Sequence, residues 1–197
     1  MKTKLFAALA LLALLALLVG GCVVPSLQPL FAERDYLYAP ELVGTWVSKD
    51  DPEKEVWVFA EDGRHYRLTH TDRKGHRATF HVAAGSLGTN TFLDFSPLDL
   101  MPGQELNNLM GSFILPVHLF AKLVKTNDDL TLVALDAEWL NERLKANPKE
   151  IAHVLQGNDV PLLTGSTEEV KKFVTRHASD TNAFKSAIIL TAKKSAK

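Results

Sequence analysis

This 197-residue sequence contains a single cysteine, Cys22. A lone cysteine has no partner for an internal disulfide, so the fold must become stable by burying a core. The sequence also lacks any long block of charge of one sign, and its formal net charge is −1. A nearly neutral surface gives no reason to expect nucleic acid as a partner.

The common sequence signatures of catalysis are also missing. There is no Gly-x-Ser-x-Gly elbow, no P-loop and no Gly-x-Gly-x-x-Gly. Paired acidic residues such as Asp128-Asp129 stand in turns rather than apart on a scaffold, as an acid and a base would. We therefore predict no catalytic residues, no cofactor and no enzymatic activity.

Histidine is the residue type that most invites a metal-site hypothesis. His65, His70, His76 and His81 fall within a short stretch. In a strand only even spacings place side chains on one face, so the spacings of five separate His65 from His70 and His76 from His81. His70 and His76 can approach each other across a hairpin, but two imidazoles fall short of a four-ligand zinc site. We predict surface histidines and no metal site.

The N-terminus carries the longest apolar run, from Leu5 to Val19, after a basic start at Lys2 and Lys4. A transmembrane helix needs about 20 apolar residues, more than this run provides. A removable export signal typically has a positive start, then a short apolar stretch and then small residues, which here are Gly20 and Gly21.

The residues Leu18-Val19-Gly20-Gly21-Cys22 resemble the lipobox of bacterial lipoproteins. The resemblance implies that a signal peptidase recognises Leu18, Val19, Gly20 and Gly21, cleaves after Gly21, and leaves an acylated Cys22 at the new N-terminus. Two or more acyl chains hold a protein stably on a membrane, whereas one does so only marginally. Val23 stands where some lipoproteins carry a retention aspartate, which implies the periplasmic face of the outer membrane in a host with two membranes. In other hosts it implies the outer face of the cell membrane.

The remaining chain is long enough for one domain. We predict residues 1–21 as the removed signal, 22–40 as the lipidated cysteine and tether, 41–192 as a single β-rich domain and 193–197 as a frayed basic tail. Three prolines stiffen the tether, although its apolar residues indicate that part of it lies against the domain.

Alternating apolar and polar residues predict a series of antiparallel strands. Asp62-Gly63 and Asp72-Arg73-Lys74-Gly75 are turn signals between them. The expected strands are Val43–Ser48, Glu55–Ala60, His65–Thr71, Arg77–Ala83, Asn90–Phe95, Phe113–Lys125, Leu130–Leu135, Val160–Thr164 and Phe184–Thr191. The polar segment Ser96–Ser112 is expected to be a long connection or lid.

Helices are expected only towards the C-terminus. Asp136 is a suitable N-cap for a helix over Ala137–Ala146, and Pro148 suits the first position of a second, short helix. Ser166 to Glu169 form a capping box before a third helix. The predicted fold class is therefore mainly β (α+β): an antiparallel meander that closes into a barrel of seven or eight strands, with two or three C-terminal helices.

Gly44-Thr45-Trp46 resembles the Gly-x-Trp that opens lipocalins, which implies a lipocalin-like barrel with Trp46 in its core or near its ligand. Asp94 shares a strand face with Phe92. That face either enters the barrel, where a carboxylate needs a partner, or is solvated.

The mature chain also resembles a loose group of uncharacterised bacterial lipoproteins. The similarity lies in Cys22–Leu27, Leu42–Trp46 and Leu163–Glu169, and it implies no known activity.

These observations favour a lipid-anchored envelope protein whose domain is a non-catalytic binding or structural module. The expected partners are the membrane, through the covalent lipid, and a small apolar ligand held in the barrel. An envelope assembly factor that docks a protein partner is the alternative, and a hydrolase is the least favoured function. An apolar cavity would support the first and an exposed apolar patch the second.

Overall fold

The computed structural model describes residues 23–99, 114–126, 128–156 and 160–193. Cys22, the recognition residues Leu18 to Gly21, and residues 100–112 of the expected Ser96–Ser112 connection lie outside the described residues. Within the described ranges, no helix is long and apolar enough to cross a bilayer.

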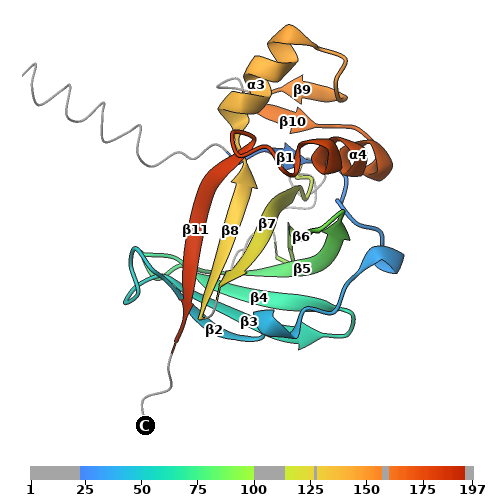
Figure 1. Cartoon of the computed structure of the whole chain (residues 1–197). Coiled ribbons are helices and arrows are strands. Elements are labelled where there is room, and N and C mark those ends of the chain that lie inside the picture. Colours follow the sequence, from blue (N-terminus) through green and yellow to red (C-terminus); the bar gives the residue numbers. More distant parts are fainter. Residues whose placement is uncertain (1–22, 100–113, 127, 157–159, 194–197) are drawn as a thin grey trace, which may run out of the picture.

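Eight antiparallel strands form a closed barrel (Figure 1). In order around the ring they are β2 (Gly44–Ser48), β3 (Val56–Asp62), β4 (His65–Thr71), β5 (Arg77–Leu87), β6 (Asn90–Pro97), β7 (His118–Thr126), β8 (Asp129–Leu135) and β11 (Phe184–Ala192). The ring closes because β6 pairs with β7, and this confirms the expected barrel.

Short turns account for the meander. Asp62 pairs with His65 across the β3–β4 hairpin, and Gly63 between them has a φ of 69°. Gly75 in the β4–β5 turn has a φ of 85°, again in the left-handed region that glycine tolerates best. The turn signals read from the sequence therefore mark the hairpins correctly.

The inner face of the barrel forms one hydrophobic core. Its fully buried side chains include Phe59, Leu68, Val82 and Leu93, from four neighbouring strands. Trp46 belongs to this core and donates its indole N–H to Leu42 O at 2.8 Å. The bond satisfies the one polar atom that burying a tryptophan would otherwise leave unpaired.

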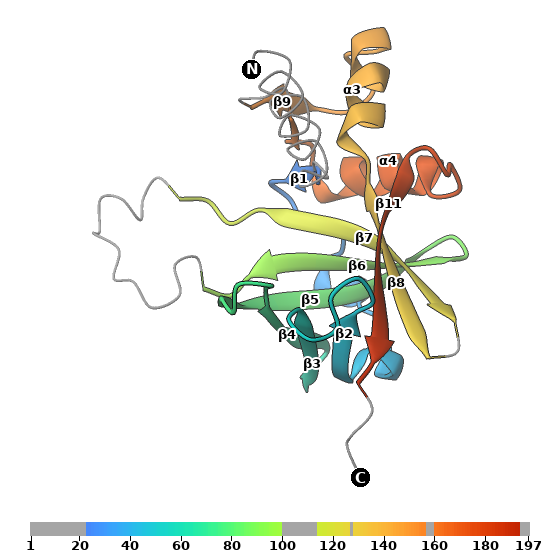
Figure 2. The same ribbon diagram turned by 90° about the vertical axis from the view of Figure 1, so that its left-hand side faces the viewer.

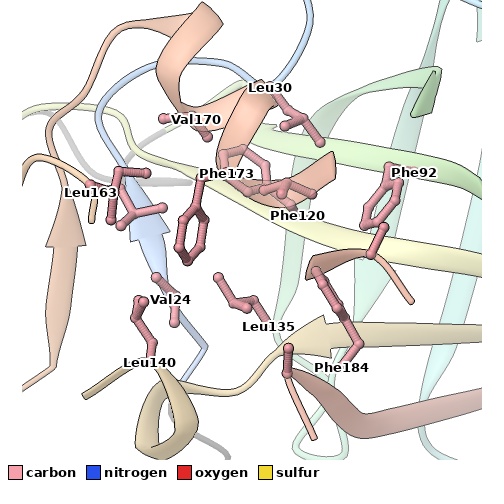
Figure 3. Packing of buried hydrophobic residues seen from close by; sticks show 14 of the residues in the cluster. Val24, Leu30, Phe92, Phe120, Leu135, Leu140, Leu163, Val170, Phe173 and Phe184 are labelled. Atoms are coloured by element: carbon pink, nitrogen blue, oxygen red, sulfur yellow. The ribbon is translucent and has the colours of Figure 1, made fainter. Parts of the chain in front are cut away.

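A second core lies outside the barrel wall. Figure 3 shows Phe92, Phe120 and Phe184 of the wall packed with Leu163 and Phe173. Beyond β7 the sheet continues through β1 (Pro25–Ser26), β10 (Pro161–Leu163) and β9 (His153–Leu155). With the helices α3 (Ala137–Ala146) and α4 (Thr167–His177), these strands lie on one side of the barrel in both views (Figures 1 and 2).

The segment Val23–Ala39, here called the N-terminal strap, corrects the expected tether. Leu30 and Phe31 are almost fully buried in the outer core, and Ser26 is buried in β1 between β7 and β10. A 3₁₀ helix at Glu33–Asp35 and another at Pro40–Leu42 lead into β2. Residues 23–39 are therefore part of the folded body, which the prediction began at residue 41.

Other boundaries also differ from the prediction: β5, for example, continues to Leu87 instead of ending at Ala83. The residues after Pro148 form a turn closed by Glu150 N–H to Asn147 O, then the unexpected strand β9, instead of a short helix. Strand β7 begins at His118, two residues after Pro116, because proline has no N–H for a ladder. The predicted caps are present: Asp136 accepts from Trp139 N–H, and Ser166 and Glu169 form the capping box.

Glu150 joins the two helices. Its carboxylate is 3% exposed and accepts from Arg143 Nη2 at 2.7 Å, and it lies 3.0 Å from His177 Nε2. The bond from Arg143 is the main cause that lowers the pKa of Glu150, and His177 adds to it. Because the folded pKa is depressed, this stabilisation is present above the ordinary glutamate pKa and disappears as the pH falls through the folded value.

We expect Glu150→Gln to lower the free energy of unfolding by about 2–3 kcal/mol at pH 7, because it removes bonds to a charged acceptor. The loss should shrink as the pH falls, and urea denaturation at several pH values measures it. Glu142→Gln, which breaks the exposed pair with Lys145, is the control and should change stability by less than about 0.5 kcal/mol. Equal losses in both variants would contradict a special role for Glu150.

Candidate ligand-binding cavity

A cavity of about 510 Å³ occupies one end of the barrel interior. That end, called the open end here, carries the β2–β3 loop, the β4–β5 turn and the first residues of β7 and β11. The lining is Val23, Trp57, Leu68, His70, Phe80, Phe95, Leu119, Phe120, Ala121, Leu132, Ala134, Ser186, Ala187 and Ile188. Most of these side chains are apolar, as is usual for small-molecule sites.

The mouth of the cavity follows from how the ring closes. Strand β11 pairs with β2 only over Leu190–Ala192, whereas it pairs with β8 along most of its length. Its earlier residues therefore run past the end of β2. Ile188 pairs with Leu132 and faces the cavity, yet 42% of it is exposed. The cavity thus opens to the surroundings beside the first half of β11.

His70 belongs to this lining. Its Nε2 is buried and makes no hydrogen bond among the described residues, although Glu55 Oε1 lies 3.4 Å away. The ring packs against Trp57, with centroids 4.6 Å apart. The other oxygen of Glu55 accepts from Arg73 Nε at 3.2 Å. The imidazole nitrogen is therefore turned towards Glu55, and the ring contributes its face to the lining.

The expectation of surface histidines is correct for His76 and wrong for His70. His76 is exposed in the turn and bonds Asp72, whereas His70 reaches the cavity. His81 packs on His65 with ring centroids 4.1 Å apart, a pair that the spacing along one strand did not reveal. Burial, and then the charge of His65, lowers the pKa of His81.

Among the residues that the structure describes, no group of three or more potential ligand side chains is arranged to hold a metal ion.

Asp94 does not enter the barrel, and its face is not solvated. It follows the inward-facing Leu93 and so points to the outer face, where it is 3% exposed beneath the N-terminal strap. Its Oδ2 accepts from Leu30 N–H at 2.7 Å, and its Oδ1 lies 2.8 Å from His118 Nδ1. The sequence could reveal the shared face with Phe92 but not the segment that covers that face.

The Asp94–His118 pair resembles the orienting half of a catalytic triad. Ser26 stands opposite His118 in the β1–β7 register. However, Ser26 is fully buried and donates its hydroxyl to Gln28 O at 2.7 Å. The described bonds of Asp94 and Ser26 thus hold the strap in place, and they do not present a nucleophile to solvent.

Comparison of the chain with protein-family models, curated proteins and solved structures gives no match. The cavity and the lipobox resemblance of Leu18–Cys22 are therefore the features that bear on function. Sequence alternation had placed Leu68 and Phe80 inward, which is their position in the lining. The contributions of Val23, Trp57 and Ser186 depend on how the ring closes, and no local pattern carries that information.

Proposed function

We propose that this protein is a lipid-anchored binding module that holds an apolar ligand in the barrel cavity. The observation that carries the proposal is the 510 Å³ cavity with its largely apolar lining. Sites of about 300–1,000 Å³ with apolar walls and a few polar groups are typical of small-molecule binding. An unfilled cavity in a core would cost stability, so its retention favours an occupant.

The lining also suggests what kind of molecule fits. Aromatic and aliphatic side chains favour a hydrocarbon body, because transferring apolar surface from water into such a site is favourable. The polar lining residues His70 and Ser186 favour a ligand that carries a hydrogen-bonding end group. A fatty acid, or another single-headed amphiphile, combines these two properties.

The anchor belongs to the same proposal and is supported by the sequence Leu18–Cys22, which resembles a lipobox. Acyl chains on Cys22 would hold the binding module at a membrane surface. Such a surface is where apolar molecules with a polar end are most concentrated.

A second function, docking of a protein partner, has one observation in its favour. Strand β9 ends the described sheet and exposes Val154 and Leu155. An edge strand with exposed apolar side chains can pair with another chain. These are two adjacent side chains on an open edge, whereas the cavity is enclosed by a largely apolar lining, so ligand binding remains the preferred proposal.

Two neighbouring isoleucines of β11 provide the test. Ile188 points into the cavity, whereas Ile189, 38% exposed, is absent from the lining and alternates to the other face. We expect Ile188→Trp to fill the mouth and weaken binding of a conjugated polyene fatty acid by about tenfold or more, or about 1.4 kcal/mol. Ile189→Trp should bind it as the unaltered protein does.

The binding assay uses Cys22→Ser protein in solution and follows polyene fluorescence, which rises in apolar surroundings. Circular dichroism should show that both tryptophan variants remain folded. The proposal fails if the unaltered barrel takes up no polyene, or if the two variants weaken binding equally.

A further inference from the structure

The chain enters the folded body at the mouth of the cavity. Val23 lines the cavity and forms a β-bridge with Asp136 at the end of β8. The next residue, Val24, is buried in the outer core. The first described residue is thus fixed at the open end of the barrel, and it is 39% exposed there.

This position leaves no length of chain between the mouth and Cys22. Consecutive Cα atoms are about 3.8 Å apart, so a lipid on Cys22 would be attached one residue from the cavity-lining Val23. The fully extended tether of residues 22–40 would have allowed the domain to stand about 60 Å from its anchor. Because the strap is packed, that freedom is lost.

Apolar side chains are exposed at the same end of the barrel. Ile188 stands in the mouth, Leu98 follows the end of β6, and Leu115 precedes the start of β7. Leu98 donates its N–H to Thr79 O, which places it beside the lining residue Phe80. Exposed apolar side chains around an opening suit a surface that contacts lipid.

We propose that the open end of the barrel lies against the bilayer, so that the cavity takes its ligand directly from the membrane. This inference rests on the proposed function, including the lipid on Cys22. The partner is a lipid surface, and the ligand class is an acyl-chain amphiphile dissolved in it. The anchor then acts as an orienting device, because it presents the mouth, and not the opposite hairpins, to the lipid.

Two labelling positions test the orientation. Leu98→Cys places a label at the open end, and Arg64→Cys places one in the exposed β3–β4 hairpin at the opposite end. The chain has no other cysteine than Cys22, whose thiol would be acylated, so each new thiol is unique. Both full-length proteins are reconstituted in phosphatidylethanolamine–phosphatidylglycerol vesicles that contain a lipid with brominated acyl chains.

We expect the brominated lipid to quench a fluorophore at position 98 several-fold more than one at position 64. A flexible insertion of about 20 Gly and Ser residues between Cys22 and Val23, which spans about 25 Å, should remove most of this difference. Equal quenching at the two positions would overturn the orientation. Quenching at position 98 that survives the insertion unchanged would overturn the role of the short anchor in setting it.

Failure of the proposed function would give results that differ from those of a wrong orientation. If the soluble Cys22→Ser protein bound no polyene, the proposed apolar ligand would be contradicted, whatever the quenching shows. If the Cys22→Ser protein still fractionated with membranes, the proposed lipid anchor would be contradicted. Polyene binding in solution combined with equal quenching at both positions would leave the binding module intact and overturn only the membrane-facing mouth.

Discussion

Replacing Asp94 with alanine should lower the free energy of unfolding by about 3–5 kcal/mol, one of the two largest losses expected in this protein. The carboxylate accepts from Leu30 N–H and lies 2.8 Å from His118 Nδ1, and it is almost completely buried. Alanine would leave both groups without their acceptor beneath the strap. Each such bond to a charged acceptor contributes about 1.5–3 kcal/mol.

Two variants separate this effect from a general loss of a carboxylate. Asp94→Asn keeps an oxygen that can accept from Leu30 N–H, so about half of the stability should return. Asp62→Ala removes an exposed pair with Arg67 and should cost less than about 1 kcal/mol. Urea denaturation of the three proteins measures the differences. A loss for Asp94→Ala no greater than that for Asp62→Ala would show that the buried pair does not hold the strap.

The effect would matter for the proposed function, because the strap follows the proposed anchor directly in the chain and contributes Val23 to the cavity. Asp94 fixes Leu30, and the packed strap in turn fixes Val23 at the mouth. A loosened strap would stand away from the barrel wall, as the extended, proline-stiffened part of the predicted tether would. The buried carboxylate is therefore part of what would keep the open end against the bilayer, although it lies on the other side of the barrel wall.

The barrel itself was predictable because its signals are local. Alternation predicted the β4 and β5 faces, and Asp62-Gly63 predicted the hairpin that joins β3 to β4. Helix caps are equally local, so Asp136 and the Ser166–Glu169 box could be identified from a few residues. Each of these features depends on residues only two to four positions apart.

The strap and the cavity were not predictable in the same way. Period-two alternation assigns Asp94 and Phe92 to one face, but it does not say which face is inside the barrel. Nor does it show that Leu30 and Phe31, about 60 residues earlier, cover that face. Proline-rich composition suggested an extended tether, and tertiary packing overrode it.

The place of Val23 combines the two kinds of information. The lipobox resemblance would make Cys22 the attachment point, and only the structure shows that the next residue lines the cavity. Neither observation alone bears on how the barrel would meet a membrane. Together they would place the proposed lipid one residue from the cavity.

Phe31→Ala is the second substitution expected to have a large effect, at about 3–5 kcal/mol of unfolding free energy. The ring is 1% exposed and lies directly over Gly85 of β5. A methyl group at Gly85 would come within 2.5 Å of the ring atom Cε1 of Phe31. Removing the ring would leave a void in the outer core and release the strap from the barrel wall.

The same contact predicts that Gly85→Ala destabilises the protein by about 1–3 kcal/mol, because the new methyl group forces the Phe31 ring to move. In the double variant Phe31→Ala/Gly85→Ala the methyl group occupies space that the ring has left. The combined loss should therefore be smaller than the sum of the single losses by about 1 kcal/mol or more. Leu37→Ala, an exposed position of the same strap, is the control and should cost less than about 0.5 kcal/mol. Additive losses in denaturation experiments would mean that Phe31 and Gly85 are not in contact, and the strap would then have to be held by Asp94 without this packing.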